Sequence, residues 1–170
     1  MNKITCMAQN EYDATPRELR TFAILQILLT AGFLAALFWM LGGTDAPFPS
    51  PVVWIGLLVA VALSAVLAER VWLSAVPLDP DDDPDDNRST AIGVYAAQTV
   101  RKLTICEAPM LLAVIVAFFV GAGGWPILVA GVPGLAVLAF EVWPSLRNVS
   151  MTATMLDADG AQSDLIESFV

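Results

Sequence analysis

Four long apolar stretches separated by short polar segments dominate the pattern of the chain. They cover residues 21–42, 51–68, 103–122 and 125–143. Each holds roughly 18–22 mostly apolar residues, and a helix of that length spans a hydrocarbon core of about 30 Å. The period-two alternation that is typical of a membrane β-barrel is absent. The pattern therefore predicts an all-α integral membrane protein, a four-helix antiparallel bundle in contact with the lipid bilayer.

Local signals indicate where these helices begin and end. Thr15 can cap the first helix, Pro16 suits its first position, and Glu18 completes a capping box. Gly42 should stop that helix. Residues 121–124 read Gly-Ala-Gly-Gly and should form a tight turn that joins the third and fourth helices.

Basic residues set the expected orientation in the membrane. All eight fall in the N-terminal tail, between the second and third apolar stretches, or in the C-terminal tail. Residues 43–50 and 123–124 contain none. Under the positive-inside rule, both termini are cytoplasmic and the protein is a multi-pass protein of the cell membrane.

The polar segments complete the expected organisation. Residues 1–14 read as a mobile tail, and residues 15–76 form the first transmembrane hairpin. Residues 77–88 hold six Asp and three Pro and should be an acidic, disordered cytoplasmic loop. Residues 89–146 form the second hairpin, and residues 147–170 form a cytoplasmic tail.

Helical periodicity resumes at Ser89, ahead of the third apolar stretch. It predicts an amphipathic cytoplasmic extension of the third helix, lying on the membrane or on the inner ends of the first two helices. Its apolar side should contain Ile92, Tyr95, Thr99, Val100 and Leu103. In the C-terminal tail we expect a turn at residues 157–160 between two short apolar faces, formed by Met151, Met155 and Leu156 and by Leu165, Ile166 and Phe169.

Two carboxylates, Glu107 and Glu141, lie within apolar stretches. Glu107 should lie roughly 6 Å below the inner interface, with Glu141 at a similar depth. The favoured interpretation is a structural girdle of ion pairs with the arginines at that level; ion or proton handling and contact with a partner subunit are the alternatives. The arginines concerned are Arg20, Arg70, Arg101 and Arg147.

Two further residues stand out inside the apolar stretches. Gln26 shares a helix face with Thr30, and a glutamine in hydrocarbon should face another helix; a substrate contact is the alternative. Pro109 removes one backbone hydrogen bond near Ile105 and should kink the third helix. Thr104 or Cys106 could partly satisfy the freed carbonyl.

The residue inventory argues against several classes of function. The chain has no histidine, and its two cysteines, Cys6 and Cys106, lack metal-ligand spacing. We therefore expect no metal, no cofactor and no enzymatic activity. A broad basic patch is also missing, which argues against nucleic-acid binding.

Residues 107–119 read Glu-Ala-Pro-Met-Leu-Leu-Ala-Val-Ile-Val-Ala-Phe-Phe and resemble the carboxylate-bearing helix of rotary ATPase proteolipid ring subunits. That resemblance would imply ion carriage by Glu107. The chain lacks the glycine-repeat helix of those proteins, and Glu107 is on the third helix rather than an even-numbered one, so we do not adopt it.

The four-span layout, the entry into the third helix through Arg101 and residues 107–109, and the tail at residues 143–148 look like small integral membrane proteins of unassigned function, often from high-GC actinobacteria. This likeness implies a fold and a bacterial inner-membrane location, and no activity. We expect a non-enzymatic accessory or scaffold subunit of a larger membrane complex, with partner membrane subunits or as a homo-oligomer. The alternative is a small transporter or proton- or ion-coupled channel that uses Glu107.

Overall fold

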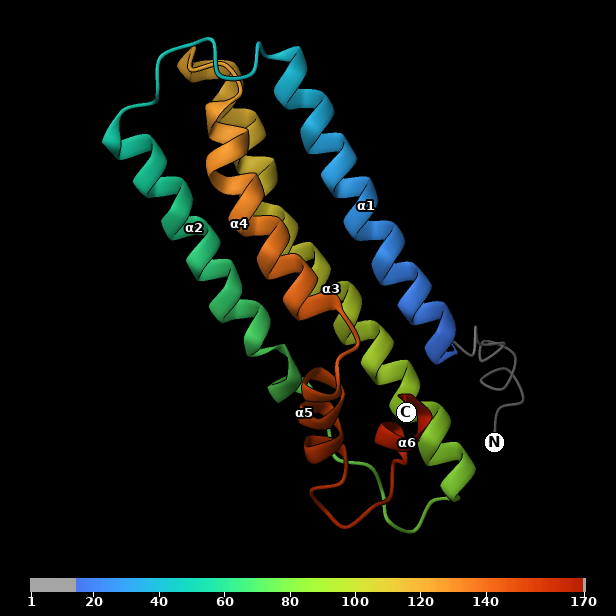
Figure 1. Cartoon of the computed structure of the whole chain (residues 1–170). Helices are drawn as coiled ribbons and strands as arrows, with labels where there is room; N and C mark the ends of the chain where they lie inside the picture. The colour runs from blue at the N-terminus through green and yellow to red at the C-terminus, as the bar shows by residue number, and fades with distance from the viewer. Residues whose placement is uncertain (1–14, 170) are drawn as a thin grey trace, which may run out of the picture.

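The computed structural model describes residues 15–169 (Figure 1). Within that range the chain is all-helical and has no strand, which confirms the predicted class. The elements are α1 (Pro16–Met40), α2 (Pro51–Glu69), the 3₁₀ helix η2 (Val71–Ser74), α3 (Pro84–Val120), α4 (Trp125–Val142), α5 (Leu146–Leu156) and α6 (Leu165–Phe169). The tail at residues 1–14, which includes Cys6, lies outside the described residues.

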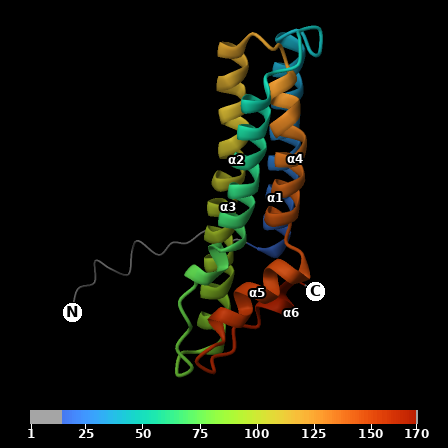
Figure 2. The same cartoon turned by 90° about the vertical axis from the view of Figure 1, so that its left-hand side faces the viewer.

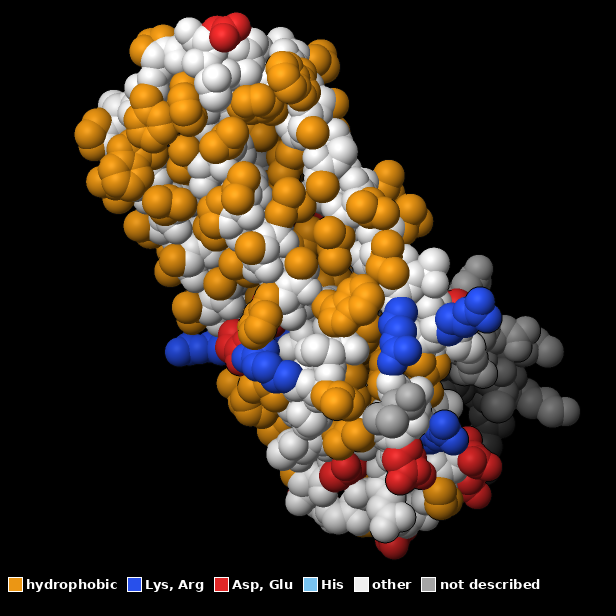
Figure 3. Space-filling model, viewed as in Figure 1, with side chains coloured by type: hydrophobic (Ala, Val, Ile, Leu, Met, Phe, Trp, Pro, Cys, Tyr) orange, Lys and Arg blue, Asp and Glu red, His pale blue; other side chains and the backbone are white. Residues whose placement is uncertain are grey.

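The helices α1, α2, α3 and α4 are each long and apolar enough to cross a membrane. They lie side by side in both views of the molecule (Figures 1 and 2). Apolar side chains cover the long helices, whereas Lys and Arg side chains gather toward the end that carries α5 and α6 (Figure 3). This arrangement is that of a multi-pass membrane protein.

Two connections meet at one end of the molecule. The backbone amide of Gly124 donates to the carbonyl oxygen of Gly43 at 2.8 Å, and the indole nitrogen of Trp125 donates to the carbonyl of Ala46 at 3.0 Å. A Cβ on Gly124 would lie 2.5 Å from the ring of Phe38, so only glycine fits this close approach. At the other end lie η2, the first half of α3, α5 and α6, which we call the polar end.

The predicted helix signals are confirmed. The Thr15 hydroxyl accepts from the Glu18 amide at 3.3 Å, and the Glu18 carboxylate accepts from the Thr15 amide at 2.8 Å. Gly121 ends α3 in the left-handed conformation, with φ of 63°. The expected turn at residues 157–160 is also present.

The four long helices are not equally buried. In the most apolar 18-residue window of α4, 44% of the residues are buried, against 11% in α1. Part of the burial of α4 comes from close packing on α3 at Gly134, where a Cβ would come within 2.8 Å of the Met110 side chain. Helix α1 packs mainly against α4 and touches α3 far less. The α1 side of the molecule is therefore the most open.

A separate apolar cluster holds the polar end together. Helices α5 and α6 pack on the first half of α3, and the rings of Tyr95 and Phe169 meet edge to face at 5.1 Å. The extension of α3 is thus covered by the C-terminal tail rather than only by the ends of the first helices. Of the apolar positions predicted at this end, Val100 and Ile166 are exposed and do not pack in this cluster.

The acidic segment at residues 77–88 differs from the expected disordered loop. Helix α3 begins at Pro84, five residues before Ser89. The amide of Leu78 donates to the carbonyl of Leu156 at 2.9 Å, and the buried Asn87 side chain donates to the carbonyl of Asp79 at 3.0 Å. Composition does not predict these contacts, because the segment is mostly solvated aspartates and only a few of its residues pack on other elements.

Candidate functional site

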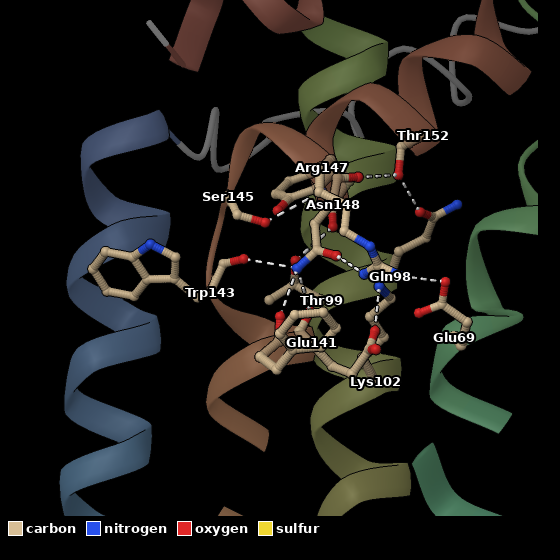
Figure 4. A network of polar contacts seen from close by, with 12 residues as sticks. Glu69, Gln98, Thr99, Lys102, Glu141, Trp143, Ser145, Arg147, Asn148 and Thr152 are labelled. Carbon is tan, nitrogen blue, oxygen red and sulfur yellow. Dashed lines mark hydrogen bonds and ion pairs between the residues drawn. The ribbon is translucent and has the colours of Figure 1, made fainter. Parts of the chain in front are cut away.

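A buried ion pair lies where α3 and α4 meet the polar end (Figure 4). The Lys102 ammonium nitrogen is 2.9 Å from Oε2 of Glu141, and the two side chains are only 9% and 4% exposed. Lys102 precedes the buried Cys106 by one helical turn and shares its face. Glu141 sits in the last turn of α4. Because both charges have left water, each depends on the other for compensation.

A second ion pair lies at the surface beside the first. Arg147 of α5 pairs with Glu69 at the end of α2, and its guanidinium also lies 4.8 Å from the centre of the Phe140 ring. The Glu69 carboxylate raises the pKa of Arg147. Glu69 and Glu141 line the same groove between α2 and α4, and Arg147 donates to the Asn148 side chain, whose amide nitrogen donates to the Glu141 carbonyl. Two acids and two bases therefore form one neutral network that joins α2, α3, α4 and α5.

Neutral polar side chains fix α5 onto this network. The amide nitrogen of Asn148 donates to the carbonyl oxygens of Phe140, Glu141 and Trp143 at 3.0, 3.1 and 2.9 Å. Phe140 and Glu141 are in the last turn of α4, where carbonyls have no intrahelical donor, so Asn148 satisfies them. Thr152 donates to the buried Gln98 side chain on α3 at 2.9 Å.

Glu107 lies apart from the network. Its Oε1 atom accepts from the Gln26 amide nitrogen at 2.8 Å and from the Thr30 hydroxyl at 2.9 Å. All three side chains are half-buried. They line a groove of about 250 Å³ between α1 and α3, whose other walls are apolar, with Leu29, Leu34, Met110, Leu111 and Phe33. We call this the α1/α3 groove.

Glu107 lies farther along the long helices than the buried pair, since it is five residues, or about 7.5 Å, beyond Lys102 on α3. Glu107 lies level with Gln26 and Thr30, which are about 9–15 Å beyond Arg20 along α1 at about 1.5 Å per residue. Glu141 stays at the polar end with Lys102. The two carboxylates therefore do not share one girdle, and Glu107 pairs with none of the four arginines within residues 15–169.

Three of those arginines have other neighbours. Arg20 donates to the carbonyl oxygen of Phe169, and Arg101 approaches the Ser74 hydroxyl at 3.4 Å. Arg70 caps the end of α2, is exposed, and lines a groove of about 520 Å³ between α2 and α4 together with Glu69 and Glu141.

Pro109 is buried, and α3 continues through it as one helix. Thr104 donates to the carbonyl of Val100 at 3.1 Å, so its hydroxyl is not turned to the carbonyl freed near Ile105. The predicted kink stays a prediction.

Sequence reasoning missed Lys102, Glu69 and Asn148 as members of the network. Helical periodicity could have found Lys102, because the buried face of α3 recurs every three or four residues. That face contains Tyr95, Gln98, Thr99, Lys102, Cys106, Pro109, Met110, Ala113 and Ala117. Asn148 gave no such signal, since its role depends on how the chain turns after Pro144.

The arrangement compensates the charges at the polar end, and it leaves Glu107, within the apolar part of α3, with two neutral donors and no basic partner among the described residues. Within residues 15–169, no group of three His, Cys, Asp or Glu side chains could hold a metal ion. Comparisons with protein-family models, with curated proteins and with solved structures found no match for this chain. The two resemblances therefore stay predictions.

Proposed function

We propose that this protein is a non-enzymatic accessory or scaffold subunit of a larger membrane complex. The observation that carries the proposal is the position of Glu107 in the α1/α3 groove. A carboxylate at this depth is costly unless it is covered or compensated, and such residues usually face protein rather than lipid. Here it is only half-buried, on the most open side of the molecule. A partner subunit seated on this side would cover it.

The rest of the molecule suits a docking role. The polar end is held by two ion pairs and by the Asn148 and Thr152 hydrogen bonds, so it presents a fixed surface. Two carboxylates, Glu69 and Glu141, also line the groove between α2 and α4, but each is paired with a base of the chain. The α1 side is therefore the favoured contact with a partner.

In this proposal the long helices form an antiparallel bundle in a bacterial inner membrane, with both termini cytoplasmic. The gathering of Lys and Arg at the polar end supports that orientation (Figure 3). The test uses single cysteines, Asp45→Cys and Asp159→Cys, in a chain that carries Cys6→Ser and Cys106→Ser. A membrane-impermeant maleimide should label intact cells at position 45 and not at position 159; the reverse pattern would refute the orientation.

The proposed function is tested by purifying the tagged chain in mild detergent at its native level. We expect a partner membrane protein in fixed stoichiometry, identified by mass spectrometry, and its loss with Glu107→Gln while the chain stays folded. A chain that elutes alone at native abundance, in several mild detergents, would contradict the proposal.

A second candidate is a proton- or ion-coupled transporter. The observation in its favour is the pair of donors, Gln26 and Thr30, that fix one oxygen of Glu107 in an open groove next to Pro109. This candidate predicts an ion flux in proteoliposomes of the purified chain. The transporter is preferred over the subunit role if Glu107→Gln abolishes the flux while the protein level and the recovery of a partner stay unchanged.

A further inference from the structure

Only one of the two Glu107 oxygens is engaged by the described chain. Both donors, Gln26 and Thr30, bind Oε1. Within residues 15–169, no hydrogen bond or ion pair reaches Oε2. Two neutral donors compensate a carboxylate partly, and a buried negative charge is stabilised far more by a cation.

The bases nearest to Glu107 along α1 and α3 have other partners. Lys102 is buried against Glu141, and Arg101 lies at the Ser74 hydroxyl. Arg20 binds the Phe169 carbonyl at the polar end, about 9–15 Å along α1 from the groove. The described fold thus supplies full charge compensation to Glu141 and none to Glu107.

A second copy of the chain offers no cation that could pair with Glu107 within the apolar spans. The apolar stretches at residues 21–42, 51–68, 103–122 and 125–143 contain no Lys and no Arg. In another copy, Lys102 is enclosed between α3 and α4 and is 7% exposed. A homo-oligomer therefore covers the groove without neutralising Glu107.

The groove admits a side chain from the lipid side. Helix α1 touches α3 only weakly, and the groove between them has a volume of about 250 Å³. On its rim Leu29 and Leu111 are 58% and 54% exposed, so apolar contact surface surrounds the carboxylate. An apolar rim around one charged acceptor fits a transmembrane helix that carries one basic residue.

We infer that the α1/α3 groove binds a transmembrane helix of a different protein, and that this helix places a Lys or Arg side chain against Oε2 of Glu107. The inference rests on the proposed function and adds the chemistry of the partner. Charge complementarity at membrane depth selects this occupant over a second copy or a purely apolar helix.

The test uses the full chain in phosphatidylcholine nanodiscs and a synthetic helix as the probe. The probe is a Leu/Ala peptide of about 22 residues, enough to span the bilayer, with one Lys about 12 Å from its interfacial end. The control peptide has Leu in place of that Lys. Association is followed by energy transfer between a donor dye on the chain and an acceptor dye on the peptide.

We expect the Lys peptide to bind the chain about tenfold more tightly than the Leu peptide, the size of one good polar contact between membrane helices. Glu107→Gln should abolish this difference, whereas the matched control Glu167→Gln, at the exposed surface of α6, should keep it. Leu111→Trp, which fills the groove and leaves the carboxylate in place, should weaken binding of the Lys peptide.

Equal binding of the two peptides overturns the inference, and so does a difference that survives in Glu107→Gln. Circular dichroism and elution volume show whether each variant is folded. A photo-crosslinker at position 111 of the native chain distinguishes failure of this inference from failure of the proposed subunit role. A native partner crosslinked there through a span without a basic residue refutes the inference and leaves the subunit role standing; a native chain with no partner refutes the subunit role.

Discussion

Two carboxylates of this membrane protein, Glu141 and Glu107, lie in opposite situations. Glu141 is buried, is paired with Lys102 at 2.9 Å, and belongs to a neutral network that ties four helices together. Glu107 is half-buried, lies deeper along the long helices, and receives only the neutral donors Gln26 and Thr30. A charge that the fold compensates internally serves the fold. A carboxylate that has only neutral donors, on an open side of the molecule, indicates a binding partner from another chain.

The largest effect is expected for Lys102→Met, which tests the buried pair of Lys102 and Glu141. It leaves the Glu141 carboxylate buried without a cation, and breaking a buried pair in this way costs about 3–5 kcal/mol. We expect that loss in the unfolding free energy measured in mixed micelles by titration with a denaturing detergent. The double variant Lys102→Met/Glu141→Leu should recover most of it, because no unpaired charge remains. A single variant as stable as the parent would show that the pair is not what holds α3 to α4.

The next effect in size is expected for Asn148→Ala. The carbonyls of Phe140, Glu141 and Trp143 lose a shared donor, and the contact with Glu141 is buried. The Trp143 carbonyl keeps the Ser145 amide as a donor, so the loss comes mainly from the other two carbonyls, and an unsatisfied buried group costs about 1–3 kcal/mol. Thermal unfolding of the purified chain measures the loss. The matched control is Ser150→Ala on the same helix, whose hydroxyl bonds only the carbonyl of Arg147 and whose removal should change little.

A smaller effect is expected at the exposed pair. Glu69→Gln removes the charge opposite Arg147, and since both side chains are more than a third exposed, the pair contributes less than about 1 kcal/mol. The pKa of Arg147 should fall toward its ordinary value, although the guanidinium stays charged at neutral pH. A loss as large as that of Lys102→Met would place the centre of the network at the surface instead of at the buried pair.

The smallest effect on stability is expected for Glu107→Gln. The new amide oxygen can still accept from Gln26 and Thr30, so the unfolding free energy should change by less than about 1 kcal/mol. Detergent titration of the variant beside the parent checks this. A loss of several kcal/mol would make Glu107 a structural residue like Glu141 and remove the contrast between the two.

Much of this fold follows from local patterns in the sequence. The four spans follow from apolar length, the start of α1 from its capping box, and the end of α3 from Gly121. Each signal acts within a few residues, so no knowledge of neighbouring helices is needed.

The pairing across helices could not be derived in the same way. Gln26 and Thr30 were seen to share a face, but the rotation of α1 relative to α3 decides what that face meets, and apolar stretches leave this rotation open. Lys102 is predictable from the buried period of α3. The expected pairing of Glu107 with arginines rests on their similar level in the membrane, and level alone does not say which side chains meet. The order at residues 77–88 arises from contacts with α5 and is invisible to composition.

The most direct test of the central claim compares Glu107→Gln with Glu141→Gln in one experiment that reads both the unfolding free energy and the recovery of a native partner in mild detergent. We expect Glu107→Gln to keep its stability and lose the partner, and Glu141→Gln to lose stability because Lys102 is left buried without its counter-charge. Recovery of the partner in full with Glu107→Gln would contradict the claim that this carboxylate is left for a partner to complete.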